Sequence, residues 1–169
     1  MATIEVKTNI FVCFHRRCDQ NYFEGFSRYF DSGFEIVKDR ILDRAIDCND
    51  SNRAIHRIRQ TLIAKTDCTF VFCGPNTPKC HWIDWEIEAT LEARHGLIGI
   101  RLPTYTPDAG ENSNIPPRLL DNIHSGYALW VQWKALDQGP GYLLDLIETA
   151  TSKQPELISN RRLIQQPAD

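Results

Sequence analysis

Short apolar runs alternate with amphipathic segments along most of the chain. Continuous apolar runs of this length are typical of strands buried on both faces of a parallel sheet. The run at 68–73 is the clearest, because aromatic and β-branched residues dominate it. The predicted strands are 10–14, 34–37, 68–73, 97–100 and 127–133.

Helical periodicity fills much of the chain between these runs. The predicted helices are 19–30, a segment capped by Asp50 or Ser51 with Ile55, Ile58 and Leu62 on one face, 78–95, and 142–150. The stretches 38–49 and 103–117 lack periodicity and are predicted to be loops. Alternating strands and helices predict an α/β fold with a mostly parallel sheet covered on both faces and with right-handed crossovers.

Length and composition fit one globular domain. The chain has 169 residues, of which 42% are hydrophobic and 24% charged, and this balance argues against disorder. Residues after 152 are mostly polar. We therefore predict a domain over 1–152 and a loosely held polar tail over 153–169.

Net charge and hydropathy limit the classes of binding partner and the cellular location that we expect. A net charge of -3 and a pI of about 5.9 argue against a nucleic-acid coat or a membrane-surface binder. There is no apolar run of about 20 residues, as a membrane span needs. The N-terminal residues lack the pattern of a signal peptide, so we expect a cytoplasmic protein.

The six cysteines are spaced poorly for zinc, and no C-x-x-C pair occurs. In a chain long enough to fold without covalent links, we expect reduced, mostly buried thiols and neither a structural metal nor a disulfide.

The predicted helix over 78–95 carries a candidate catalytic acid. Helical spacing places the polar side chains of Asp84, Glu88, Glu92 and His95 on one stripe, predicted to be solvated, and Ile83, Ile87 and Leu91 on a second stripe facing the sheet. A third stripe holds Trp82, Trp85, Glu86, Ala89 and Ala93, on which Glu86 is the only charge. A carboxylate among aromatic and small apolar groups is partly desolvated, as functional acids often are. The alternative is a structural carboxylate stabilised by the helix dipole and an ion pair.

Other candidates follow from the rule that ligands of such sheets lie beyond the carboxyl ends of the strands. The first strand is followed by His15, Arg16 and Arg17, and the third by 74–76. His15 is either catalytic or a hydrogen-bonded structural residue. The arginines of the first third are either solvated or face a phosphate. Neither a G-x-G-x-x-G nor a G-K-[ST] loop occurs, which excludes the Rossmann dehydrogenase and P-loop classes.

Over about residues 8–135 the chain resembles the TIR-like proteins of bacterial antiphage defence, in particular the Thoeris-type TIR-like subunit. The matching segments, in order, are the strand 10–14 with His15 and Asp19, the strand and loop 69–77, the W-x-x-x-E helix at 82–87, and the strand 97–100. The resemblance implies a flavodoxin-like three-layer sandwich with a central five-stranded parallel sheet in the order 2-1-3-4-5.

The same resemblance implies cleavage of NAD at the nicotinamide–ribose bond, with Glu86 as the catalytic glutamate. NAD is then a substrate, and no cofactor or metal is expected. Nicotinamide leaves as a neutral base, so one carboxylate that stabilises an oxocarbenium-like transition state suffices. The candidate substrate-binding residues are Phe14, His15, Arg16, Arg40, Asn76 and Trp82.

We expect an ADP-ribose-derived signal that activates a separate effector protein in antiphage immunity, and a homo-oligomeric enzyme. Two alternatives remain open. One is a non-catalytic TIR-like adaptor or sensor that assembles with partner proteins. The other is a different flavodoxin-like nucleotide enzyme, such as a nucleoside hydrolase or transferase.

Overall fold

The five apolar runs form one parallel sheet. The computed structural model describes residues 7–37, 53–106 and 114–164. Within these ranges the sheet order is β2-β1-β3-β4-β5 and every neighbouring pair is parallel, which confirms the predicted fold. The strands are β1 (Thr8–Cys13), β2 (Phe34–Ile36), β3 (Cys68–Cys73), β4 (Gly96–Arg101) and β5 (Leu129–Gln132).

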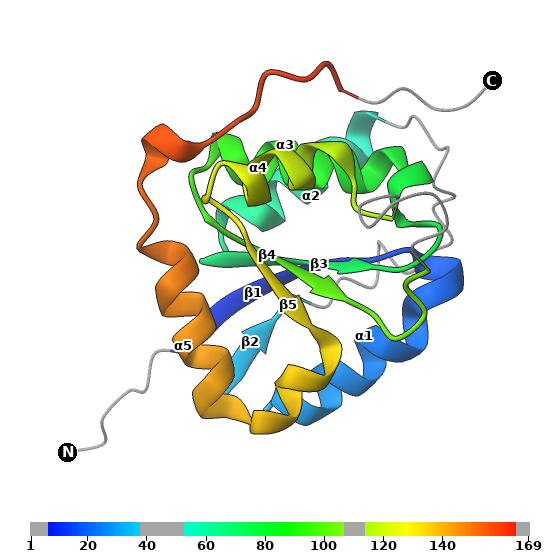
Figure 1. The fold of residues 1–169 in the computed structure, drawn as a ribbon, viewed down its shortest axis with the longest axis vertical. Helices are drawn as coiled ribbons and strands as arrows, with labels where there is room; N and C mark the ends of the chain where they lie inside the picture. Colours follow the sequence, from blue (N-terminus) through cyan, green and yellow to red (C-terminus); the bar gives the residue numbers. More distant parts are fainter. Residues whose placement is uncertain (1–6, 38–52, 107–113, 165–169) are drawn as a thin grey trace.

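Helices cover both faces of the sheet (Figure 1). The α3 face is the one covered by α2 (Arg53–Ala64), α3 (His81–Glu92) and α4 (Pro117–His124). The opposite, α1 face is covered by α1 (Arg16–Phe30) and α5 (Pro140–Thr151). Short 3-10 helices are η1 (Thr77–Lys79), η2 (Trp133–Gln138) and η3 (Pro155–Leu157). The expected caps Asp50 and Ser51 lie outside the described residues.

The segment predicted as one helix over 78–95 is divided in two. Cys80 has an extended backbone, with φ -92° and ψ 106°, and separates η1 from α3. At the other end α3 stops at Glu92, before the predicted Gly96, and Arg94 takes a left-handed conformation with φ 57°. The glutamate at position 86 therefore lies in the second turn of α3.

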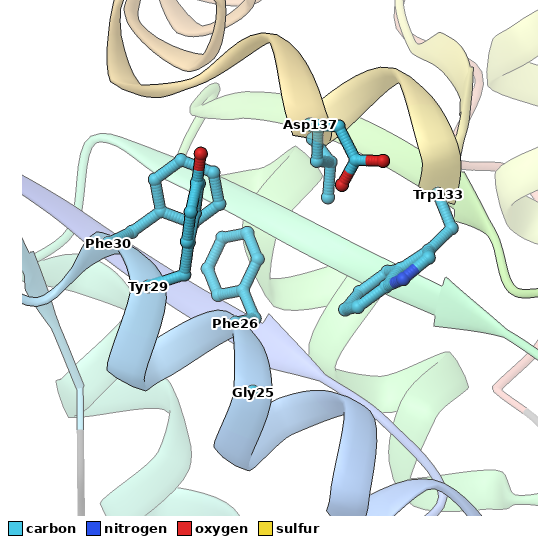
Figure 2. Close-up of a pocket in the computed structure, with 7 residues that line it drawn as sticks. Gly25, Phe26, Tyr29, Phe30, Trp133 and Asp137 are labelled. Carbon is cyan, nitrogen blue, oxygen red and sulfur yellow. The ribbon is translucent and has the colours of Figure 1, made fainter.

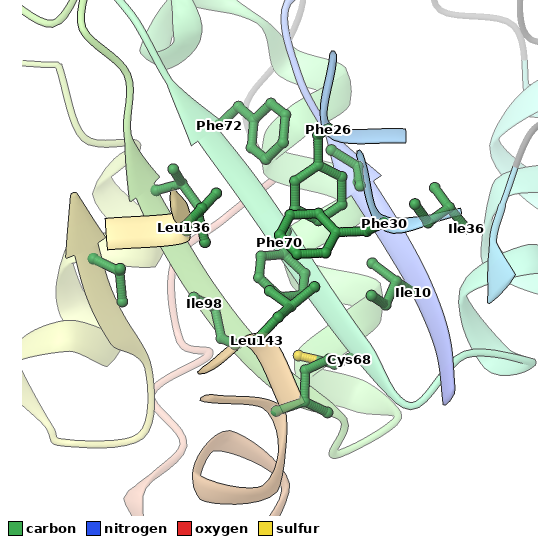
Figure 3. Close-up of a cluster of buried hydrophobic side chains, with 14 of the residues drawn as sticks. Ile10, Phe26, Phe30, Ile36, Cys68, Phe70, Phe72, Ile98, Leu136 and Leu143 are labelled. Carbon is green, nitrogen blue, oxygen red and sulfur yellow. The ribbon is translucent and has the colours of Figure 1, made fainter. Parts of the chain in front are cut away.

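Two hydrophobic cores lie on the two faces of the sheet, and alternating side chains of the central strands contribute to each. In β1, Phe11 and Cys13 point to the α3 face, whereas Ile10 and Val12 point to the α1 face. On the α1 face, Phe70 of β3 packs beneath Phe26 and Phe30 of α1, as Figure 3 shows. Burial on both faces is what the continuous apolar runs indicated.

A cavity of about 220 Å³ opens between α1 and η2 on the α1 face (Figure 2). We call it the α1–η2 cavity. Its lining residues are Gly25, Phe26, Tyr29, Phe30, Trp133, Leu136 and Asp137.

The segment 159–163, which we call the C-terminal strap, is tied to α4. Asn122 donates from Nδ2 to the Ser159 carbonyl at 2.7 Å and accepts from the Ser159 amide at 2.9 Å. Arg162 pairs with Asp121 at 2.5 Å. The prediction of a loosely held tail is therefore wrong for these residues, because polar side chains of α4 supply partners for the strap backbone.

The cysteines follow the prediction only in part. Cys13, Cys68 and Cys73 are buried free thiols, and Cys18 is free but exposed. Cys80 is disulfide-bonded, so the expectation of no disulfide is wrong for it. Sequence spacing does not reveal which cysteines the fold brings together. No helix within the described ranges has the length and apolar character to cross a bilayer.

Candidate functional site at the carboxyl edge of the sheet

Two loops meet where β1 and β3 end. After β1, His15 caps α1, and its carbonyl accepts hydrogen bonds from the amides of Cys18 and Asp19 at 3.1 and 2.8 Å. After β3, Asn76 donates from Nδ2 to Cys18 Sγ at 3.3 Å. The structure therefore places the predicted residues His15 and Asn76 at adjoining loops, at the edge where ligands of parallel sheets bind.

Gly74 allows these loops to approach closely. A Cβ atom at this position would lie 3.2 Å from both carboxylate oxygens of Asp19 and 3.2 Å from Thr104 Oγ1. The loop itself is held by the buried Thr77, whose hydroxyl accepts from the Gly74 amide at 2.8 Å and donates to the Phe72 carbonyl at 3.2 Å. The ends of β1, β3 and β4 are thus packed together around one glycine.

Asp19 is a buried acid that the sequence pattern did not predict as a site residue. It is 1% exposed, and its Oδ2 has no hydrogen-bond partner within the described residues. Burial raises the pKa of Asp19 to about 6. Asp19 lies in the first turn of an amphipathic helix, where acids are common because they interact favourably with the helix dipole. Sequence spacing therefore could not predict that this acid is buried.

Phe14 and Arg16, the other residues predicted in the first loop, pack against neighbouring side chains of the same loop and of α1. The Phe14 ring is 7% exposed and stacks on Phe23, with ring centroids 4.6 Å apart and planes 9° apart. The Arg16 guanidinium carbon lies 5.3 Å from the centre of the same ring. Phe14 and Arg16 therefore form a wall of the loop, and Arg16 remains half-buried. Arg40 lies outside the described residues.

Glu86 is a buried carboxylate on α3, with 5% exposure. Trp82, one turn earlier, is 2% exposed and packs edge-on against Trp85 at 5.0 Å between centroids. One turn after Glu86, the Thr90 hydroxyl oxygen lies 2.8 Å from the Glu86 carbonyl and 2.8 Å from Thr69 Oγ1 of β3. This contact fixes the helix that carries Glu86 to the central strand.

The opposite stripe of α3 differs from the solvated one predicted. Asp84 is 6% exposed because Arg118 of α4 covers it, with Nε 2.9 Å from Asp84 Oδ1 and Nη2 3.3 Å from Oδ2. Burial, together with the hydrogen bond to Glu92 and the charge of Glu92, raises the pKa of Glu88 to about 7. The prediction of simple solvation is therefore wrong for Asp84.

No group of three or more histidine, cysteine or acidic side chains in the described ranges is placed to hold a metal ion. The arrangement instead offers a buried carboxylate on α3 and, at the adjoining strand ends, aromatic, amide and arginine side chains that suit a nucleotide.

A five-stranded parallel sheet in the order 2-1-3-4-5 is the flavodoxin-like arrangement. The model of one family, "Thoeris protein ThsB, TIR-like domain", matches residues 11–107, more than half of the chain. The chain belongs to this family, as the motifs predicted. No curated protein sequence matches it.

Solved structures have a similar fold at low sequence identity. The Clostridium botulinum CMP N-glycosidase BcmB is 15% identical, with a TM-score of 0.51 over 82% of this chain and 97% of that one. The TIR domains of the activated Roq1 resistosome, which recognises the pathogen effector XopQ, are 15% identical, with a TM-score of 0.45 over 86% and 82% of the two chains.

Proposed function

We propose that this protein cleaves NAD at the nicotinamide–ribose bond, with Glu86 as the catalytic carboxylate. The observation that carries the proposal is the burial of Glu86 on α3, within the segment matched by the ThsB TIR-like family. A carboxylate in a low-dielectric site interacts strongly with positive charge that develops on a substrate.

The reaction suits a single acid. The nicotinamide ring of NAD is cationic and departs as a neutral base, so the leaving group needs no proton. Positive charge then develops on the ribose, where Glu86 would stabilise it and hold a ribose hydroxyl. A water molecule or a hydroxyl of the substrate attacks the ribose carbon and gives ADP-ribose or a cyclic isomer. CMP N-glycosidase has the same fold, so the fold is compatible with breaking N-glycosidic bonds.

The remaining roles belong to the residues at the strand ends. Phe14 and Trp82 would form apolar walls, whereas His15, Arg16, Arg40 and Asn76 would contact the polar parts of NAD. The product would act as a signal for a separate effector protein in antiphage defence, and the enzyme would work as a homo-oligomer.

The test is nicotinamide release by the purified full-length protein, followed by chromatography over a range of protein concentrations. Glu86→Gln keeps the shape and removes the charge, so we expect the rate to fall about 10²–10³-fold with little change in thermal midpoint. Glu148→Gln, an exposed position on α5, is the matched control and should leave the rate unchanged.

Glu88→Gln tests the choice of acid, because Glu88 is half-buried on the same helix. It should change the rate by less than about five-fold. The proposal is wrong if Glu86→Gln releases nicotinamide like the parent, or if Glu88→Gln loses as much. A parent protein that releases none at any concentration would favour a non-catalytic adaptor.

A further inference from the structure

The α1–η2 cavity lies on the face of the sheet opposite to α3 and Glu86 (Figure 1). Its volume of about 220 Å³ is below the roughly 300–1,000 Å³ of pockets for drug-sized ligands. An occupant must therefore be small, and it cannot be the substrate bound at Glu86.

Four aromatic rings line the hollow, and packing holds three of them in place. Phe30 is 2% exposed and lies 4.9 Å from Phe26 between ring centroids. Phe26 is 1% exposed and lies 5.4 Å from Phe72, centroid to centroid. Trp133 packs edge-on against Phe72 at 5.4 Å and against Tyr22 at 5.2 Å. The fourth ring, Tyr29, is 55% exposed and lies at the mouth. The aromatic lining is thus formed in advance of any ligand.

One carboxylate, that of Asp137, lies at the rim between these rings (Figure 2). It forms no hydrogen bond or ion pair with any residue that the structure describes. Lys134, one turn earlier in η2, is exposed and does not reach it within 4 Å. A free acid beside aromatic faces is complementary to a positive charge.

Gly25 borders the cavity. It lies in the middle of α1, where glycine destabilises a helix relative to alanine. Its φ is not in the left-handed region, and an added Cβ would meet no atom within 4 Å. Neither backbone conformation nor packing in the protein therefore requires glycine here, whereas a larger side chain would enter the cavity that Gly25 lines.

We propose that the α1–η2 cavity binds a small organic cation, an alkylated ammonium group, with Phe26, Tyr29 and Trp133 around its apolar body and Asp137 as the counter-charge. Aromatic faces attract such cations through the ring quadrupole, and quaternary ammonium groups are recognised by aromatic cages of this kind. A neutral apolar ligand would make no use of the Asp137 carboxylate at the rim. A bare metal ion would find one carboxylate among its possible ligands, fewer than Ca²⁺ or Mg²⁺ requires.

An alkylated ammonium group can come from two sources: a free ammonium compound, or an alkylated lysine side chain of another protein. Choline represents the first and a short peptide with a central trimethyl-lysine represents the second. The neutral isostere 3,3-dimethylbutan-1-ol has the shape of choline without its charge.

Binding is followed on the full chain through the indole N–H signal of Trp133 in ¹H–¹⁵N spectra, assigned with Trp133→Phe. We expect choline, the peptide or both to shift this signal to saturation, and the isostere to bind about ten-fold more weakly. Asp137→Asn should weaken binding by about the same factor, and Gly25→Leu should abolish it. The controls are Asp145→Asn and Gly141→Leu, exposed positions on α5 outside the cavity, which should bind like the parent.

The proposal is overturned if neither probe shifts the Trp133 signal at 20 mM, if the isostere binds as well as choline, or if Asp137→Asn leaves the affinity unchanged. Because Asp137 is exposed, its variant remains informative even if Gly25→Leu fails to fold. Nicotinamide release is measured on the same proteins and should not change, so this site and the site at Glu86 are tested separately.

Discussion

Single buried polar side chains determine how this edge of the sheet responds to pH. Asp19 is buried beside Gly74, and burial raises its pKa to about 6 from an ordinary value near 4. An acid with a raised pKa binds its proton more tightly in the folded state. Its contribution to stability is therefore greatest at low pH and is lost as the pH rises to about 6.

Replacing Asp19 by Asn removes this loss. We expect the free energy of unfolding of Asp19→Asn, relative to the parent, to increase between about pH 4 and pH 6 and then level off, by about 3 kcal/mol at most. Urea unfolding at several pH values measures it. Asp145→Asn, on the exposed surface of α5, should show no such trend, and a flat difference for Asp19→Asn would contradict the assigned burial effect.

The residues of the candidate site differ in how far sequence could predict them. The burial of Glu86 could be predicted because Trp82, Ile83 and Ala89, three and four positions away, are apolar, so one helix suffices for the argument. Asp84 has an equally regular setting, yet Arg118, 34 residues later, buries it. Asp19 is likewise buried beside Gly74, which only the completed sheet brings near.

At the scale of elements, β4 and β5 pack unusually closely at one position. Gly99 pairs with Trp130 in the register, and a Cβ at Gly99 would lie 2.7 Å from Trp130 Cε3 and 3.1 Å from Leu119 Cδ2. A glycine inside a strand often marks such a close approach. Here it lets the Trp130 ring pack against β4, next to Leu119 of α4.

Gly99→Ala should therefore lower the free energy of unfolding by about 1–3 kcal/mol, because the indole must move. The double variant with Trp130→Leu should cost less than the sum of the two single changes. Gly25→Ala, where a Cβ meets nothing, should instead raise stability by about 0.5–1 kcal/mol. Additive effects of the Gly99 and Trp130 changes would mean that the two residues do not constrain each other.

Elements with strong local patterns were predicted well, whereas α4 was not. The strand 68–73 was predicted with the bounds that β3 has, because every residue of it is buried. The segment before α4 contains Pro, Gly and Asn, which predicted a loop up to 117. Pro117 is in fact the first residue of α4, a position that proline favours because its missing N–H costs nothing there.

At the scale of the whole molecule, Arg118 connects three parts of the chain that are distant in sequence. It is 1% exposed, pairs with Asp84 on α3, and donates to Asn160 Oδ1 at 2.6 Å and to the carbonyls of Arg162 and Leu163 at 3.0 and 3.2 Å. One guanidinium thus holds α4, α3 and the C-terminal strap together.

Arg118→Leu should lower the free energy of unfolding by about 3–5 kcal/mol, since it leaves the Asp84 carboxylate buried without its partner. Trypsin should then cleave at Arg161 and Arg162 faster than in the parent, because the strap is released. The double variant Asp84→Leu, Arg118→Leu should recover most of the stability but not the protection of the strap. A double variant as unstable as the single one would show that the charge pair is not the cause.

The contact between Thr90 and Thr69 has a consequence for motion. Both side chains are fully buried, and their hydroxyl oxygens lie 2.8 Å apart. Separating α3 from β3 would break this hydrogen bond inside an apolar core, which is costly. Helix and strand should consequently open as one cooperative unit, with amide hydrogens of α3 exchanging with deuterium as slowly as those of β3. A molecule that reaches Glu86 must then enter by rearrangement of the loops at the edge of the sheet, while the helix beneath it stays closed.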